Sequence, residues 1–262
     1  MHNIEDATLT ERLTSELSSL EINNARYKSA GTAGILWKES AGDYPVSTVS
    51  DEEFIWLYEK KLARKSSPAR AYYDRILASA LLRRCPYCNY NKATTLDHFL
   101  PKKRYASMAI DPWNLVPCCK DCNHHMLAGV ALTGSEYGFH PYFEVVTDTW
   151  LAVEIVNDAG VAAIFTADCP TSWPPELVMR VQNVFRNLDL ADSYASASGA
   201  AIAEMQRHLR RLFDGGGSDA VRTHLEESAE SIDHVSPNAW RAVLYRGLAN
   251  CDWYCAGGFE AG

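Results

Sequence analysis

The chain has 262 residues, 47% of them hydrophobic and 22% charged, a composition that excludes wholesale disorder and suits a globular protein. Its formal net charge of −8 argues against a protein that coats nucleic acid through its overall charge, although a local basic segment can still bind it. The polar N-terminus has no apolar signal-peptide core, and no apolar run reaches the ~20 residues of a membrane span. We therefore expect a cytoplasmic protein without a membrane partner.

The N-terminal part of the chain is predicted to be helical. Leucines at helical spacing indicate a helix over residues 5–20. Ser50 and Asp51 are the expected N-cap of a helix that runs to Leu62, and Ser67-Pro68 is the expected start of another. The apolar stripe of this last helix, which leads the chain toward the first cysteine pair, comprises Tyr72, Ile76, Leu77, Ala80 and Leu81.

Two CxxC pairs follow, and they predict a structural zinc site. Cysteines in a chain without a signal peptide are metal ligands or free thiols more often than disulfides. Cys85 and Cys88 form the first pair and Cys119 and Cys122 the second, and together they supply the four thiolates that tetrahedral zinc prefers. Four thiolates leave no position for water, so this zinc would only tie together the ends of the 30 residues between the pairs. Cys118 breaks the two-residue spacing and is expected to be a buried thiol.

The segment between the pairs carries residues suited to phosphodiester hydrolysis. Asp97 offers a hard oxygen ligand for a magnesium-type ion, and His98 can act as a general base near neutral pH. Asn123 is expected on the first turn of a helix, where its amide oxygen could be a second ligand. Such an ion keeps positions for water and a phosphate oxygen. In a regular strand Asp97 and His98 point to opposite faces, so both serve one site only if the strand ends, bulges or twists there.

A local basic segment surrounds these residues. Residues 83–104 contain six basic residues and one acid, a local charge of +5 within an acidic protein. This segment is either a solvated loop or a surface for nucleic acid. The candidates for contact with nucleic acid are Lys102, Lys103, Arg104 and Lys120.

Three further histidines are open to more than one interpretation. His124 and His125 follow Asn123 and could reach the ion, face solvent or contact phosphate. His140, which precedes a proline, is either a structural turn residue or part of the rim of the site.

The C-terminal part is predicted to begin with a β-hairpin over residues 149–166 and a turn at residues 157–160. Helices follow, and the glycine triplet at residues 215–217 marks a break among them. The expected helices cover residues 174–187, 190–213, 218–231 and 237–250.

The pattern CxxC, DHxxP and NLxxxCxxCN, which begins at Cys85, Asp97 and Asn114, resembles the HNH (ββα-metal) nuclease family, in particular its members with a structural zinc. The resemblance implies that Asp97 and Asn123 hold a catalytic divalent ion and that His98 is the general base. Asn114 would brace the loop and orient His98 through backbone hydrogen bonds. Many members have a histidine where this chain has Asn123, and the asparagine favours Mg²⁺ or Mn²⁺ over zinc or nickel.

A wider similarity connects the chain with the HNH nuclease subunit of the Septu and retron-associated anti-phage defence systems. It implies a partner ATPase of the SMC-like, ABC type from the same operon, and cleavage of invading or host nucleic acid. The segments that carry it are residues 96–102, 113–123, 139–143 and 240–249.

We therefore predict an α+β, predominantly helical protein in three parts. An N-terminal helical region (1–82) precedes a ββα-metal core with a four-cysteine zinc (83–146). A C-terminal hairpin and helical region (147–262) completes the core or docks a partner. The predicted function is an endonuclease that hydrolyses DNA, and two alternatives remain: a non-catalytic zinc-containing adaptor that binds nucleic acid, and an RNase that cleaves transfer RNA.

Overall fold

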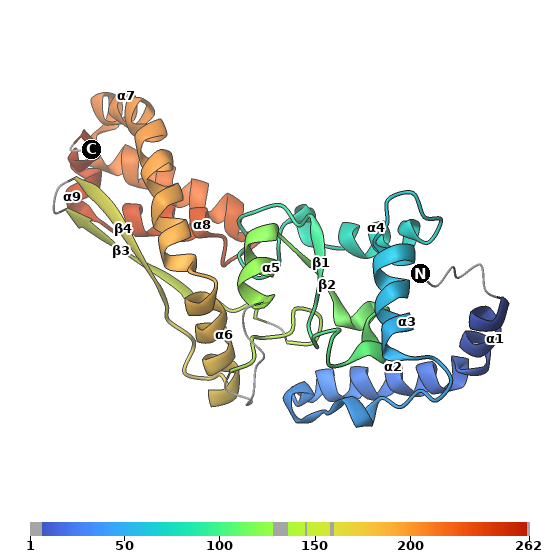
Figure 1. Ribbon diagram of the computed structural model, residues 1–262. Coiled ribbons are helices and arrows are strands. Elements are labelled where there is room, and N and C mark those ends of the chain that lie inside the picture. Colours follow the sequence, from blue (N-terminus) through green and yellow to red (C-terminus); the bar gives the residue numbers. More distant parts are fainter. Residues whose placement is uncertain (1–6, 128–135, 145, 158–159, 261–262) are drawn as a thin grey trace. The chain divides into compact units, whose positions relative to one another are not determined.

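The computed structural model shows a mostly helical chain, with two separate two-stranded sheets among the residues that it describes (Figure 1). It divides into two compact units, one of residues 1–87 and 91–145 and the other of residues 88–90 and 146–262. None of the helices in the described part of the chain combines the length and apolar character that a membrane span requires. The residues that the structure describes are 7–127, 136–144, 146–157 and 160–260.

The first unit places a small antiparallel sheet among short helices. Its strands are β1 (Thr95–His98) and β2 (Leu115–Cys118). Its helices are α1 (Ala7–Ser15), α2 (Leu17–Thr32), α3 (Asp51–Trp56), α4 (Arg70–Ala78) and α5 (Lys120–Leu127). A π-helical turn, η3 (Leu57–Leu62), continues α3. Single 3-10 turns are η1 (Leu36–Lys38), η2 (Ala41–Asp43), η4 (Leu81–Arg83), η5 (Ala106–Met108) and η6 (Pro112–Asn114).

The single helix predicted over residues 5–20 is wrong, because the chain breaks at Glu16 into α1 and α2. The Glu16 carboxylate accepts hydrogen bonds from Ser47 and Thr48, in a chain segment far from it in sequence. These hydrogen bonds lower the pKa of Glu16 to about 2. A tertiary contact therefore sets this helix boundary. The N-cap predicted at Ser50 is confirmed, since its hydroxyl accepts from the Glu53 backbone and the Glu53 carboxylate accepts from the Ser50 backbone.

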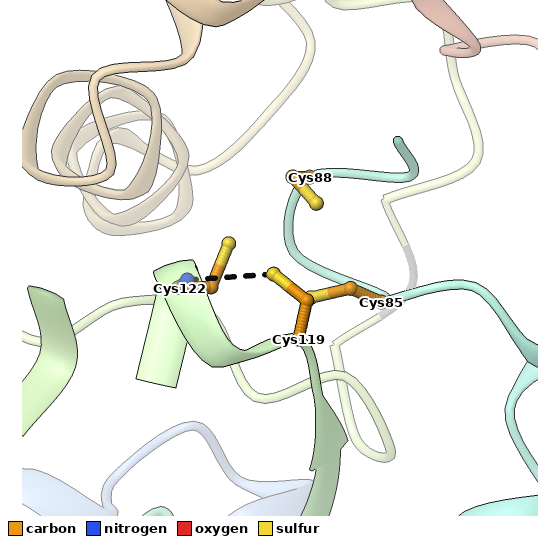
Figure 2. A group of neighbouring side chains, drawn as sticks. All are labelled: Cys85, Cys88, Cys119 and Cys122. Carbon is orange, nitrogen blue, oxygen red and sulfur yellow. Dashed lines mark hydrogen bonds between the residues drawn. The ribbon is translucent and has the colours of Figure 1, made fainter. Parts of the chain in front are cut away.

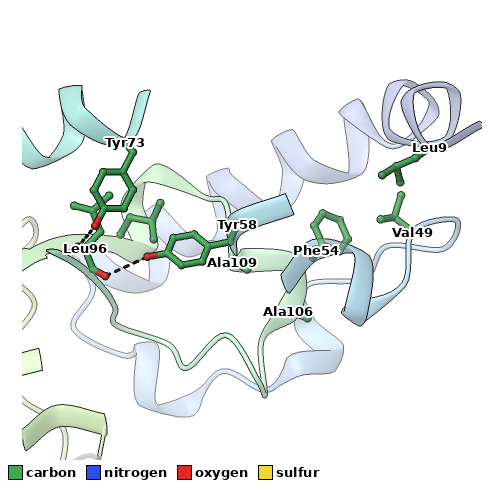
Figure 3. Close-up of a cluster of buried hydrophobic side chains, with 9 residues drawn as sticks. Leu9, Val49, Phe54, Tyr58, Tyr73, Leu96, Ala106 and Ala109 are labelled. Carbon is green, nitrogen blue, oxygen red and sulfur yellow. Dashed lines mark hydrogen bonds between the residues drawn. The ribbon is translucent and has the colours of Figure 1, made fainter. Parts of the chain in front are cut away.

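The edge of β1 that faces away from β2 is hydrogen-bonded by two tyrosines (Figure 3). The backbone N–H of Leu96 donates to the hydroxyl of Tyr73 at 3.0 Å, and the hydroxyl of Tyr58 donates to the Leu96 carbonyl at 3.3 Å. Leu96 lies opposite Pro117 in the register, at a pair whose backbone groups point outward. The missing N–H of this proline therefore leaves no gap in the ladder.

The apolar stripe predicted for the α4 region is partly wrong. Tyr72 is 62% exposed and Leu81 is 66% exposed, whereas the neighbouring Tyr73 is buried. The buried position is one residue further along because Tyr73 reaches the backbone of β1 with its hydroxyl. Tyr73 belongs to a core cluster that also contains Leu96, Tyr58 and Phe54 (Figure 3).

The second unit contains the predicted hairpin and the C-terminal helices. The hairpin is confirmed as β3 (Leu151–Asn157) and β4 (Val161–Ala167), with residues 158 and 159 of its turn outside the described residues. The break predicted at the glycine triplet is confirmed at Gly217, whose φ of +67° interrupts α7. The helices are α6 (Pro175–Asn187), α7 (Leu190–Asp233), α8 (Trp240–Ala249) and α9 (Asp252–Cys255), with the 3-10 turn η7 (Gly258–Glu260).

Candidate functional site

The four predicted zinc cysteines lie together and are buried (Figure 2). Cys119 follows β2 and Cys122 lies on the first turn of α5, where its backbone N–H donates to the Cys119 sulfur at 3.4 Å. Their sulfur atoms and those of Cys85 and Cys88 all lie within 4.8 Å of one another. This separation is compatible with one ion bonded to each sulfur at about 2.3 Å. The four cysteines could therefore hold a zinc ion.

Cys118 is a buried thiol beside this cluster, as predicted. Its sulfur lies 3.9 Å from the sulfur of Cys85, at hydrogen-bonding distance for two thiols. Cys119 completes the four-sulfur group, so the choice between Cys118 and Cys119 made from the CxxC spacing agrees with the structure.

Asp97 is buried in β1. Burial raises the pKa of its carboxyl group to about 6, and a hydrogen bond from the backbone of His98 opposes this rise. A carboxylate in such surroundings is stabilised by a cation, because burial penalises its negative charge. Asp97 is therefore suited to a metal-ligand role.

His98 is the last residue of β1, and its ring is held in one orientation. Its Nε2 lies 2.9 Å from the carbonyl oxygen of Ala109, and the ring packs edge-on against Tyr58 with centroids 4.3 Å apart. A carbonyl only accepts, so Nε2 carries the proton and Nδ1 is left with its lone pair. Burial lowers the pKa of His98 to about 4, so the ring is neutral at pH 7.

The strand register through Asp97 and His98 is unbroken. Each pairs with one residue of β2, Asp97 with Val116 and His98 with Leu115, so β1 has no bulge there. Asp97 and His98 could serve one site if the strand ended, bulged or twisted there. The structure shows the first of these, because β1 ends at His98.

Asn123 lies on α5, and its amide is oriented by Thr95. The Thr95 hydroxyl donates its single proton to the carbonyl of Cys118 at 3.2 Å, so it can only accept from Asn123. The Asn123 Nδ2 therefore donates to Thr95 at 2.9 Å, which leaves Oδ1 available as a ligand atom. Thr95 and Asp97 are two residues apart and lie on the same face of β1.

Asn114 is completely buried and braces the loop between His98 and Ala109. Its Nδ2 donates to the carbonyls of Leu100 and Met108, both at 3.0 Å, and its Oδ1 accepts from the Leu100 N–H at 2.6 Å. Leu100 lies two residues after His98, and Met108 precedes Ala109. Asn114 thus holds both ends of the loop that sets the His98–Ala109 hydrogen bond.

The four basic residues predicted to contact nucleic acid have different surroundings. Lys102 donates to the Glu59 carboxylate at 2.8 Å and lies over the ring of Tyr58, 4.8 Å from its centroid. Its charge also contributes to the lowered pKa of His98. Lys102 is therefore close to His98 and already paired with an acid. Lys103, Arg104 and Lys120 are exposed.

The three other histidines considered for the site, His124, His125 and His140, differ in their exposure to solvent. His124 and His125 are exposed on α5. His140 is 1% exposed, and its Nδ1 accepts from the Tyr142 N–H at 3.2 Å, a turn contact of the kind that one of the two interpretations predicted.

Sequence reasoning missed two residues that touch the candidate site. Thr95 was detectable in principle, because it is two residues before Asp97 on the same strand face. Tyr27, whose hydroxyl donates to Asn114 Oδ1 at 3.1 Å, is 87 residues away from it, and no local pattern marks it.

Comparison with known proteins finds a similar phage protein. Protein ea31 of Escherichia phage lambda is 31% identical over 218 residues, a match that covers 77% of this chain and 73% of the phage protein. No family model matches the chain, and none of the solved structures compared with it is similar.

Proposed function

The chain belongs to the family of phage lambda protein ea31, and we propose that it is a divalent-metal-dependent HNH nuclease that hydrolyses phosphodiester bonds in DNA. The observation that carries the proposal is the hydrogen bond between His98 Nε2 and the Ala109 carbonyl. It assigns the proton to Nε2 and leaves a neutral Nδ1 as the base. A general base in this state can take a proton from an attacking water at neutral pH.

The residues expected to hold the ion fit a hard divalent cation. Asp97 contributes a carboxylate whose charge is destabilised by burial. Asn123 contributes Oδ1, because its Nδ2 is bound to Thr95. Oxygen donors of this kind suit Mg²⁺ or Mn²⁺. Such an ion, when bound, supplies neutralisation of the charge that develops on the phosphate and on the leaving oxygen.

Each of the chain's own residues then has one task. His98 accepts a proton from the attacking water. Asn114 holds the loop whose Ala109 carbonyl orients the His98 ring. Exposed Lys103, Arg104 and Lys120 would bind the phosphates on either side, with Lys102 joining them if it leaves Glu59. The cysteine cluster takes no part in the chemistry, because four thiolates saturate a zinc ion.

The test is cleavage of supercoiled plasmid DNA and of total RNA by the purified protein with Mg²⁺ or Mn²⁺. His98→Gln is a sharper variant than alanine, because its amide can keep the hydrogen bond to Ala109 but cannot act as a base. We expect it to lose activity by at least about 100-fold with unchanged circular dichroism and zinc content. His208→Gln, at an exposed position of α7, is the matched control and should cleave normally.

Full activity of His98→Gln would remove His98 from the mechanism. A wild-type protein that cuts neither DNA nor RNA, alone or with its operon neighbours, would remove the nuclease proposal and favour the zinc-containing adaptor. Cleavage of transfer RNA and not of plasmid would make the protein an RNase.

The anti-phage role belongs to the same proposal. By its resemblance to defence nucleases, we propose that the chain acts with an SMC-like ATPase encoded beside it. Co-purification of the two proteins, and ATP-dependent stimulation of cleavage, would support this pairing.

A further inference from the structure

We propose that Tyr27 and His140 are positioning residues, which orient the amide of Asn114 and thereby keep His98 in its reactive orientation. This inference rests on the proposed nuclease function. It concerns two side chains that are 87 and 26 residues away from Asn114 in sequence but lie in the same compact unit.

The hydrogen-bonding capacity of the Asn114 side chain is fully used. Its Nδ2 donates both protons, to Leu100 and to Met108. Its Oδ1 accepts two hydrogen bonds, one from the Leu100 N–H at 2.6 Å and one from the Tyr27 hydroxyl at 3.1 Å. An amide turned by 180° would face the Leu100 N–H, which can only donate, with its own N–H groups, and it would do the same at Tyr27 as long as that hydroxyl is a donor.

His140 determines the direction in which the Tyr27 hydroxyl donates. The backbone N–H of Tyr142 donates to His140 Nδ1, so this nitrogen has no proton. Burial lowers the pKa of His140 to about 3, although backbone hydrogen bonds to Trp113 and to His140 itself act in the opposite direction. The ring is therefore neutral at pH 7 and carries its one proton on Nε2.

The Nε2 of His140 lies 3.1 Å from the oxygen of Tyr27. Because this nitrogen is protonated, it cannot accept a hydrogen bond, and the Tyr27 hydroxyl must turn its proton elsewhere. The acceptor within reach is Asn114 Oδ1. The three side chains thus form a directed chain in which His140 donates to Tyr27 and Tyr27 donates to Asn114.

The chain of hydrogen bonds continues to His98 through the loop. Asn114 holds Leu100 and Met108, the two points where the loop leaves His98 and returns to Ala109. The Ala109 carbonyl then fixes the proton of His98 on Nε2. A looser Asn114 would let this carbonyl drift and would lower the fraction of molecules in which Nδ1 is correctly placed. We expect the effect on kcat, because the hydrogen bonds of these groups go to the loop that holds His98 and to one another.

The test compares Tyr27→Phe with Tyr44→Phe. The two tyrosines have ring centroids 6.3 Å apart, and both are buried. The Tyr44 hydroxyl finds no hydrogen-bond partner in the described part of the chain. Each variant therefore removes one buried hydroxyl from the same cluster, but only Tyr27→Phe breaks a link to Asn114. A second pair of variants is His140→Gln and His140→Ala. Their comparison tests whether an amide donor in place of His140 Nε2 retains the kcat of cleavage.

Two measurements are made on each variant. The first is the kcat and KM for cleavage of a short DNA duplex with Mg²⁺ present. We expect Tyr27→Phe to lower kcat by about tenfold, the order of one buried hydrogen bond, with KM unchanged. The second is the exchange rate of the His98 Nε2 proton with solvent, measured by NMR on protein with ¹⁵N-labelled histidine. It should rise by about tenfold in Tyr27→Phe and stay at the wild-type value in Tyr44→Phe.

The outcomes separate this inference from the proposed function. Equal losses of kcat in the two phenylalanine variants, a change in KM alone, or an unchanged exchange rate in Tyr27→Phe would overturn the positioning role. Better retention of kcat in His140→Gln than in His140→Ala would support it. A wild-type protein without nuclease activity would overturn the proposed function, and with it the role of these residues in catalysis, while the exchange rates would still report whether they hold His98.

Discussion

At the scale of single residues, the candidate site depends on which atom of a side chain carries a proton. His98 and Asn123 each have two chemically different ends, and in both cases one neighbour decides which end is engaged. The Ala109 carbonyl accepts a hydrogen bond from His98 Nε2, and the Thr95 hydroxyl accepts one from Asn123 Nδ2. The atoms that remain available are His98 Nδ1, a basic nitrogen, and Asn123 Oδ1, an amide oxygen. The proposed chemistry requires these two atoms.

The buried charge of Asp97 leads to a prediction at this scale. Because burial, with a smaller contribution from the charge of Cys85, raises its pKa to about 6, the ionised carboxylate destabilises the magnesium-free protein at pH 7. Asp97→Asn should therefore stabilise zinc-loaded, magnesium-free protein by a free energy of unfolding on the order of 1–3 kcal/mol, and its melting temperature should rise accordingly. The same variant should lose Mn²⁺ binding and cleavage. Asp214→Asn, at an exposed position, is the control.

Calorimetry in magnesium-free buffer and titration with Mn²⁺ check these two effects separately. A lower melting temperature in Asp97→Asn would show that the carboxylate contributes to folding, and its assignment as a metal ligand would lose support.

At the scale of elements, β1 is positioned by side chains as much as by its partner strand. Only four residues long, it pairs with β2 along one edge and is hydrogen-bonded by Tyr58 and Tyr73 along the other. Two short strands alone form a marginal sheet. The tyrosines supply part of what a third strand would contribute, and they hold the strand whose last two residues are Asp97 and His98.

Tyr73→Phe should destabilise the protein by about 1–2 kcal/mol, because it leaves the buried N–H of Leu96 without an acceptor. Tyr72→Phe is a matched control, since its side chain is 62% exposed and should contribute close to nothing. Urea unfolding followed by circular dichroism measures both. Equal effects in the two variants would mean that the hydrogen bond to Leu96 is not a significant part of the stability.

At the scale of the whole molecule, the four cysteines join segments that are separated by 30 residues of chain. In zinc-bound form they would close a long loop, a constraint whose stabilising effect is largest when the enclosed chain is long. Metal binding at such sites contributes directly to folding, because the unfolded chain has no preformed site.

Cys88→Ser should therefore lower both zinc content and thermal stability. We expect Tm to fall by about 5 °C or more, since each kcal/mol corresponds to roughly 2–4 °C in a protein of this size. Cys169→Ser, a half-buried position outside the cluster, should keep full zinc content. Zinc analysis and differential scanning calorimetry measure the two quantities. An unchanged melt in Cys88→Ser would contradict the structural zinc site.

Local sequence signals predicted the features that are themselves local. The choice of Cys119 over Cys118 followed from CxxC spacing, and the N-cap at Ser50 from the residue types at the start of the helix. The hairpin and the break at Gly217 were predicted from turn residues and a glycine triplet. Each of these choices depends on backbone geometry within a few residues, which composition and spacing express directly, whereas the meeting of the two cysteine pairs across 30 residues is a long-range contact.

Only the tertiary structure decided how these parts are arranged around His98. Ala109, Thr95 and Tyr27 act on residues that are 11, 28 and 87 positions away, and the break at Glu16 comes from a loop more than 30 residues distant. The sequence by itself determined which residue types are present and which of them share a turn. It could not determine the proton on His98 or the orientation of Asn123, because a hydrogen bond between distant segments depends on their packing and leaves no periodic pattern in the chain.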